Sequence, residues 1–255
     1  MARIVLSASQ QEANQYAGGG TGYTDSEEYW MRHVVAVAAP IIRAAGHQVL
    51  TPNGGSYRAN VAAGNAFTGT NGYYLAVHSN ASGSATYGKA RGTVAFYKTG
   101  STLGQAFARK VYARVAAVSS ASDRGVLATS SLGEVNRPIA RYVALIEIDF
   151  HDNLLSAQEI RTKYTEYGKA IAQGVLDAAG VIATVGKKGV ITDGANVAVK
   201  QYSTLGGATR GYLRAGMEVA ILDRTATTIK VRRGSALNPL AVVGWVPIGR
   251  VRWIA

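Results

Sequence analysis

The sequence YYLAVHSNASG at residues 73–83 indicates the fold most directly. Its first five residues, Tyr73 to Val77, form an apolar run of the length of a buried strand, and the run ends at His78, where a polar loop begins. Such a run is typical of a strand in a parallel sheet that is covered on both faces. Open α/β sheets bind ligands at the carboxyl ends of their strands, so His78 stands where a functional side chain is expected.

A second stretch, ALIEIDFHDN at residues 144–153, has the same form. It places Glu147 inside an apolar run and His151 just after it. A carboxylate in such a run is costly to bury unless it is paired or functional, and a salt bridge to Arg141 or Arg124 is the structural alternative. Because His78 occupies a similar position, the two stretches together favour a shared site.

Strand-like and helix-like segments alternate on both sides of these stretches, which predicts an α/β domain over residues 1–183 with an open, mostly parallel sheet and helices on both faces. After Val181 the pattern changes to short β-rich runs broken by Gly, Asp and Asn, so residues 189–255 are predicted to form a small all-β domain behind a linker, Thr184–Lys188. The predicted helices span 26–45, 57–67, 103–118 and 156–179, and the predicted strands span 4–6, 49–50, 73–77, 93–97, 142–148, 197–200, 218–222, 228–232 and 242–246.

The net charge of +12 is concentrated at the C-terminal end, where eleven Lys and Arg face three acidic residues from Lys187 onward. A basic module of this kind favours a polyanion such as nucleic acid, an anionic membrane or a cell-wall polymer. The absence of cysteine excludes disulfides and any Cys-based metal site or nucleophile.

The apolar run Ile4–Leu6 is too short for a signal peptide, and no stretch reaches the ~18 apolar residues of a membrane helix. We therefore expect a protein that is made in the cytoplasm of its host, is not inserted in a membrane, and needs another factor to reach the cell wall if it acts there.

Among the other candidates, His33 and His47 are expected to be surface or packing residues. Thr24-Asp25-Ser26-Glu27 fits a capping box, so Glu27 alone does not require a metal.

Taken in order, these segments resemble the zinc N-acetylmuramoyl-L-alanine amidases of the amidase type 3 group, which occur in cell-wall hydrolases and phage endolysins. The resemblance covers about residues 3–180. It rests on Leu6–Asn14, the Glu at the start of the first long helix, Val77–Ala81, Ala90–Val94, Asp123–Val126, Leu145–Glu147 and Phe150–Asn153.

Such amidases hold zinc with His, Glu and His and use a second Glu as acid and base. The resemblance implies zinc as the cofactor, Glu27 as a ligand with Glu28 as the alternative, His78 as the second His, and Glu147 as the catalytic residue. The implied reaction is attack of zinc-activated water on the amide between N-acetylmuramic acid and L-alanine.

The chain departs from the family at the first ligand, because the opening strand ends in Ser9-Gln10-Gln11 and lacks the usual Gly-His. It looks like a subgroup that reads Ser-Pro-Ser-x-Gln, with Ala8 in place of Pro. Gln is a poor zinc ligand, so three alternatives are open: Gln11 or Gln10 through a carbonyl oxygen, His151 as the missing imidazole, or water. A Gln near the metal is preferred, and His151 has a second alternative role at the oxyanion.

The segments Gly244–Pro247 and Arg250–Ile254 are similar to the closing strands of bacterial SH3-type wall-binding modules. Tyr202, Trp245 and Trp253 are candidates for stacking on sugar or peptide beside an anionic polymer, the alternative being that both Trp residues belong to the core.

The predicted function is peptidoglycan hydrolysis by a phage lysin, with Asn80 and Arg124 as candidate substrate-binding residues. Peptidoglycan and anionic wall polymers are the expected partners. Two alternatives stay open. A basic nucleic-acid-binding protein explains the charge but not the conjunction of His78, Glu27 and Glu147, and a wall-binding protein that has lost its metal explains the missing His.

Overall fold

The computed structural model describes residues 1–121, 124–182, 188–192, 197–201, 207–215, 217–224, 228–233, 242–247 and 250–254. The chain divides into two compact units, Met1–Leu176 and Asp177–Ala255. The division falls inside helix α5 (Leu154–Ile182), and the predicted linker lies outside the described residues except for Lys188, the first residue of β7 (Lys188–Ile191). The boundaries at 183 and 189 therefore stay predictions.

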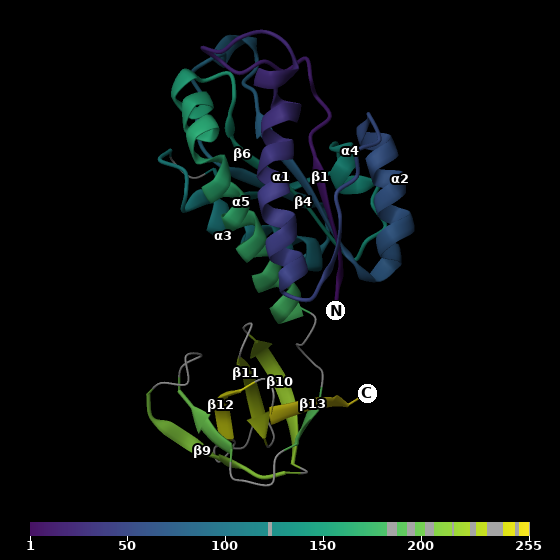
Figure 1. Ribbon diagram of the computed structural model, residues 1–255, viewed down its shortest axis with the longest axis vertical. Helices are drawn as coiled ribbons and strands as arrows, with labels where there is room; N and C mark the ends of the chain where they lie inside the picture. The colour runs from purple at the N-terminus through teal and green to yellow at the C-terminus, as the bar shows by residue number, and fades with distance from the viewer. Residues whose placement is uncertain are drawn as a thin grey trace. The chain divides into compact units, whose positions relative to one another are not determined.

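The first unit is built on a six-stranded sheet (Figure 1). Strands β2, β1, β3 and β6 are parallel, β4 runs antiparallel to β6, and β5 is parallel to β4. The prediction of a mostly parallel sheet is confirmed. In order across the sheet the strands are β2 (Gln48–Leu50), β1 (Arg3–Ala8), β3 (Tyr73–Asn80), β6 (Tyr142–Phe150), β4 (Val94–Lys98) and β5 (Val126–Thr129).

Helices cover both faces of this sheet, because successive residues of a buried strand point to opposite sides. On one face, Tyr74 and Ala76 pack with Val61 and Val135 from two helices, α2 (Tyr57–Thr68) and α4 (Gly133–Asn136). On the other, the ring of Tyr73 meets Phe107 of α3 (Thr102–Ala116) with centroids 5.4 Å apart.

Helix α5 shares that second face with α1 (Glu27–Ala44) and α3, and two glycines allow it to approach both (Figure 1). A Cβ at Gly168 would lie 2.6 Å from Val37 of α1, and one at Gly174 would lie 2.6 Å from the Cα of Val111 in α3.

No helix among the described residues combines the length and apolar character needed to cross a bilayer. Single turns of 3-10 helix lie at Tyr23–Asp25, Gly69–Asn71 and Ser84–Thr86.

Two elements of the first unit, β5 and α4, are not evident from the sequence. Each is only four residues long, which is too short to display a hydrophobic period.

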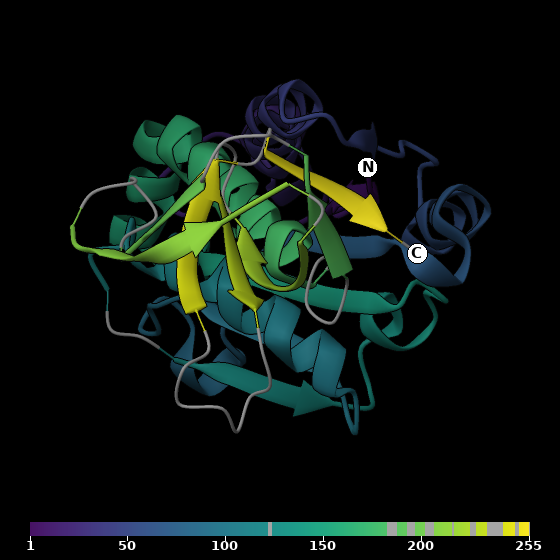
Figure 2. The same ribbon diagram turned by 90° about the horizontal axis from the view of Figure 1, so that it is seen from below.

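The second unit is an antiparallel sheet with strand order β13-β7-β10-β11-β12-β8-β9, shown in green to yellow in Figure 2. Its core consists of aliphatic side chains such as Val199, Leu213, Ile229, Val231 and Val246. The all-β prediction is confirmed, whereas the SH3-type identity stays a prediction. Besides β7, the strands are β8 (Val197–Lys200), β9 (Thr209–Leu213), β10 (Glu218–Arg224), β11 (Thr228–Arg233), β12 (Val242–Pro247) and β13 (Val251–Ile254).

Candidate active site

His78 and Glu147 are direct neighbours across the two central strands. β3 and β6 run parallel, and their register pairs His78 with Glu147 before a bulge shifts it to Asn80 and Phe150. Paired residues of adjacent strands point to the same face. The structure therefore places the two residues side by side at the carboxyl end of the sheet, where bulges often reorient functional side chains.

Glu27 joins them from the first turn of α1. The N-cap of this helix is Ser26, whose hydroxyl accepts from the amide of Tyr29, so Glu27 is the first helical residue and cannot be the third-position Glu of a capping box. The buried Oε1 of Glu27 instead lies 2.8 Å from Nδ1 of His78 and accepts from the amide of Ser79 at 3.3 Å. Glu28 pairs with Arg32. Of the two candidate acids, Glu27 is the one that faces His78.

The other ring nitrogen of His78 is held by Glu134 of α4, a buried residue that the sequence analysis missed. Its Oε2 lies 2.8 Å from Nε2 of His78, and its Oε1 accepts from the hydroxyls of Ser7 at 3.0 Å and Tyr74 at 3.4 Å. The only local signal in the sequence is an acid next to the apolar Val135.

Two carboxylates thus enclose one imidazole. Burial by itself lowers the pKa of His78, but hydrogen bonds to Glu134 and Glu27 outweigh burial and raise that pKa well above its ordinary value. In the same way burial raises the pKa of Glu27, but the hydrogen bond from His78 outweighs it and the pKa of Glu27 is lowered. His78 is accordingly an imidazolium that donates from both ring nitrogens.

Glu147 completes the cluster without a counter-charge of its own. Its Oε2 is buried and has no hydrogen-bond partner. Burial, reinforced by the charges of Glu27 and Glu134, raises the pKa of Glu147 to about 8 in spite of the nearby His78. Neither arginine of the salt-bridge alternative reaches it: the guanidinium groups of Arg124 and Arg141 lie over the rings of Phe150 and Tyr142. The cluster holds three carboxyl groups and one imidazole, so it has an excess of negative charge whenever all three carboxyl groups ionise.

Gln10 and Gln11, which follow the opening strand, lie beside this cluster. Asn14 links Gln11 to Glu27, donating to Oε1 of Gln11 at 3.0 Å and to Oε2 of Glu27 at 2.7 Å. Gln10 donates its amide to the carbonyls of Ala8 and Ser9, each at 3.2 Å. A pocket of about 230 Å³ opens here, lined by Gln10, Gln11, Gly55, Ser56, Tyr57, His78 and Glu134.

His151 is buried and turned toward Ser79. Its Nδ1 lies 2.8 Å from the carbonyl oxygen of Ser79, and its ring stacks on Tyr16, whose hydroxyl donates to Oγ of Ser79 at 2.7 Å. An N–H at Nδ1 leaves the lone pair on Nε2. Ser79 connects His151 to Glu27, but the structure does not bring His151 into hydrogen-bond contact with His78.

The two predicted substrate-binding residues are peripheral to this cluster. The side chain of Asn80 accepts from the amide of Ala81 at 2.8 Å, and exposed Arg124 donates to the carbonyl of Arg91 at 3.3 Å. Asn80 is partly exposed next to the site and stays a candidate.

The aromatic candidates of the second unit are placed only in part. Tyr202 lies outside the described residues. Trp253 belongs to β13, but its side chain is not among those described. Trp245 is partly buried in β12, opposite Lys200 of β8. The wall-binding role of these residues stays a prediction.

No protein-family model and no curated protein matches the sequence, but solved structures match the first unit. The catalytic domain of the amidase CwlV from Bacillus (Paenibacillus) polymyxa var. colistinus is 17% identical, with a TM-score of 0.55 over 69% of this chain and 96% of that one. An N-acetylmuramoyl-L-alanine amidase from Clostridium difficile 630 is 16% identical, with a TM-score of 0.58 over 69% and 95% of the two chains.

The first unit has the fold of an N-acetylmuramoyl-L-alanine amidase catalytic domain. A third match is the catalytic domain of an endolysin targeting Clostridia difficile, 21% identical with a TM-score of 0.53 over 69% of this chain and 97% of that one. At these identities the likeness establishes the amidase fold, and the chemistry has to be argued from the side chains.

The expected zinc can be tested against these side chains. In the described part of the chain, no three His, Asp or Glu side chains are arranged as they stand to hold a metal ion, because the two nitrogens of His78 face different carboxylates. The donor types nevertheless fit zinc: Glu27 and His78 are in contact, Glu134 is the kind of carboxylate that orients a ligand imidazole, and Oε2 of Glu147 is an orphaned buried oxygen. A cation would relieve the excess negative charge.

Proposed function

We propose that the chain is a zinc-dependent peptidoglycan amidase that hydrolyses the bond between N-acetylmuramic acid and L-alanine. One observation carries the proposal. Glu27, His78 and Glu147 lie together at the carboxyl end of the sheet of an amidase fold, with Glu27 and His78 2.8 Å apart and Glu147 in register with His78.

Glu27 and His78 would hold the metal, and Gln11 is the proposed third ligand because Asn14 already couples it to Glu27. Zinc in that position supplies a Lewis acid for the scissile carbonyl and for water. Since His78 is an imidazolium without metal, it has to release a proton to become a ligand. Glu134 would then hold the imidazole in place by accepting from Nε2.

Glu147 is the proposed acid and base. Its carboxylate takes a proton from the attacking water while the new C–O bond forms, and it returns the proton to the nitrogen of L-alanine as the C–N bond breaks. The products are the lactyl carboxylic acid and a free amine. A pKa of about 8 suits the donating step at neutral pH, and positive charge nearby would lower that pKa enough for the accepting step.

The second unit is proposed to bind the wall, and the setting is proposed to be a phage lysin. The basic composition of the second unit supports wall binding. The similarity of the first unit to an endolysin catalytic domain supports the phage setting.

The test is release of amino groups from purified peptidoglycan by the full chain, with reducing ends followed as a control for cleavage of the glycan. Glu147→Gln is expected to lower the rate at least about a hundredfold, as removal of a general acid–base does. Glu166→Gln is the matched control, because Glu166 is exposed on α5. If the parent releases no amino groups with zinc added, or if Glu147→Gln is as fast as the parent, the proposal is wrong.

A further inference from the structure

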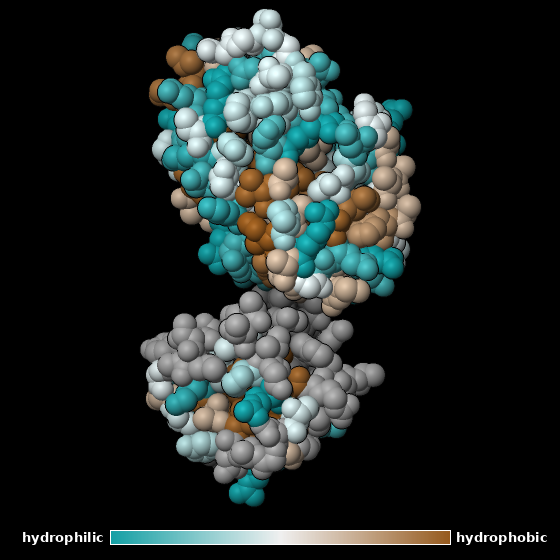
Figure 3. All heavy atoms as spheres, viewed as in Figure 1, coloured by the Kyte–Doolittle hydropathy of each residue, from teal (hydrophilic) through white to brown (hydrophobic). Residues whose placement is uncertain are grey.

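Three apolar side chains are exposed on the rim of the first unit where β6 ends. Leu154 and Leu155, the first two residues of α5, are 57% and 60% exposed, and Tyr87, in the loop before β4, is 64% exposed. We call these three residues the rim patch. Figure 3 shows hydrophobic side chains at the upper left edge of the first unit, where α5 begins. Exposed apolar side chains that gather in one place, rather than singly, mark interaction surfaces.

Two hydrogen bonds fasten the loop of Tyr87 to the start of α5. The amide of Gly88 donates to Oδ2 of Asp152 at 2.8 Å, and the side chain of Asn153 donates to the carbonyl of Gly88 at 2.7 Å. Gly88 is the chain neighbour of Tyr87, and Asn153 is the chain neighbour of Leu154. The loop and the helix therefore present their apolar side chains on one continuous surface.

The exposed charges beside the rim patch are positive. Lys89, next to the patch in the same loop, is exposed and has no ion-pair partner among the described residues. Arg124 is exposed too, and its guanidinium lies over the ring of Phe150, the last residue of β6. The acids in the two segments that carry the patch are buried: Asp152 accepts from a backbone amide, and Glu159 is paired with two cations. An apolar surface flanked by cations suits a negatively charged partner.

A lipid bilayer fits this combination better than a second protein does. A stable protein interface takes roughly 20–30 residues from each side, and three side chains fall far short of that. A bilayer needs no matching surface, because separate apolar side chains enter the headgroup boundary while flanking Lys and Arg residues bind anionic headgroups. An anionic wall polymer would neutralise the cations but would gain nothing from exposed leucines.

We propose that the rim patch docks the first unit onto the surface of an anionic lipid bilayer. Leu154 and Leu155 enter the headgroup boundary, and Lys89 binds lipid phosphate. The patch lies at the end of β6, the strand that carries Glu147. Docking therefore brings the end of the sheet that holds the candidate active site to the membrane surface, and it does not depend on the chemistry of that site.

A fluorescent label on the patch tests insertion directly. The chain has no cysteine, so one introduced cysteine can be labelled uniquely. A nitrobenzoxadiazole label on Leu155→Cys should shift to the blue and brighten with vesicles of phosphatidylglycerol and phosphatidylcholine in equal parts, and should change little with phosphatidylcholine alone. Ile139→Cys is the matched control, because Ile139 is 52% exposed and precedes β6, at the opposite end of that strand. Its label should not respond.

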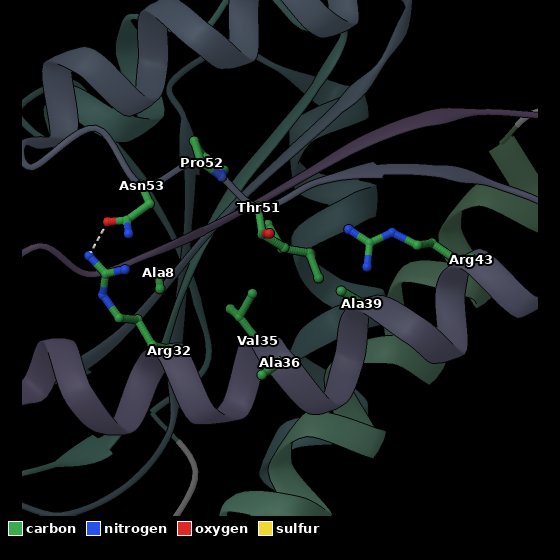
Figure 4. Close-up of a pocket in the computed structure, with 10 residues that line it drawn as sticks. Ala8, Arg32, Val35, Ala36, Ala39, Arg43, Thr51, Pro52 and Asn53 are labelled. Carbon is green, nitrogen blue, oxygen red and sulfur yellow. Dashed lines mark hydrogen bonds between the residues drawn. The ribbon is translucent and has the colours of Figure 1, made fainter.

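Co-sedimentation of the full chain with the same vesicles at physiological ionic strength measures the affinity. The double variant Leu154→Ser, Leu155→Ser is expected to bind at least about tenfold more weakly, since burial of even one leucine side chain contributes that much. Lys89→Gln should bind about fivefold more weakly. Arg43→Gln is the matched charge control and should bind like the parent, because Arg43 lines a hollow along α1 near the C-terminal end of that helix (Figure 4).

A label at position 155 that responds to anionic vesicles no more than the label at position 139 would overturn the proposal. Equal affinity of the parent and the double variant for the vesicles would overturn it as well, because only the charge of the chain would then attract it to the lipid. Self-association of the parent that the double variant abolishes, without any response to vesicles, would assign the rim patch to a second copy of the chain and would also overturn the proposal.

Discussion

Replacing Glu147 with Gln should stabilise the metal-free protein, and the gain should grow with pH. The neutral form of Glu147 is favoured in the folded state, where its pKa is about 8 against an ordinary value of 4.5. An acid whose pKa is higher in the folded state than in the unfolded state lowers the free energy of unfolding as the pH rises above the unfolded-state pKa. The loss stops growing once the pH exceeds the folded-state pKa. Gln is neutral at every pH and is not subject to this loss.

The size of the effect follows from the two pKa values. Each pKa unit corresponds to about 1.4 kcal/mol, so the penalty carried by Glu147 is close to zero at pH 4.5 and at most about 3.5 kcal/mol at pH 7. Partial exposure of the residue makes this figure an upper value. The missing hydrogen-bond partner of Oε2 supports the sign, because substitution breaks no bond at that atom.

Calorimetric unfolding of both proteins with a chelator present, between pH 5 and pH 8, measures the difference. The melting temperature of Glu147→Gln should rise above that of the parent as the pH increases. The melting temperature of Glu166→Gln should equal that of the parent at every pH. Zinc should reduce the difference, since a cation stabilises the Glu147 carboxylate. A difference that is constant with pH, or a variant that loses stability as the pH rises, would refute the account of this cluster.

Three further predictions concern the metal, the imidazole and the packing. Chelation should abolish release of amino groups from peptidoglycan, and added zinc should restore it. The affinity for zinc should rise with pH because His78 must lose a proton to bind the metal. Calorimetry in buffers of different ionisation enthalpy detects that proton release. Glu134→Gln should lower the pKa of His78, measured by NMR, because one of its two carboxylate partners becomes neutral; an unchanged pKa would contradict the role given to Glu134. The stability that this raised pKa contributes is present below about pH 6.5 and is lost as the pH rises through the folded value, so the variant should lose most stability at low pH. Gly168→Ala should destabilise the fold by about 1–3 kcal/mol, as a Cβ there would lie 2.7 Å from the carbonyl of Val34, whereas Gly20→Ala, with open space around it, should leave the melting temperature unchanged.

Local pattern predicted the scaffold of the site well. The apolar runs that end at His78 and contain Glu147 determine which strands are buried on both faces, and burial of both strands requires helices on either side. The two residues are therefore brought to one edge of the sheet by hydrophobic pattern, whereas their direct pairing in register is a feature of the structure.

The local sequence pattern could not predict the short elements, and it could not decide which of two neighbouring residues faces the site. Glu27 and Glu28 are indistinguishable in composition, and only the position of Ser26 as the N-cap decides which of them faces the site. The place of His151 after the strand did not reveal its contacts with Ser79 and Tyr16, which only the fold shows, and its role as a ligand stays a prediction.

The sequence by itself determined an α/β domain with a histidine and a glutamate at the ends of its central strands, followed by a basic all-β unit, because hydrophobic periodicity and strand-end polarity are properties of neighbouring residues. Only the tertiary structure decided that Glu134 and Glu27 enclose His78. These acids lie 56 and 51 positions from it along the chain, and such separations are bridged by sheet register and helix packing. The net charge of the cluster, and with it the raised pKa of Glu147, arises from that convergence.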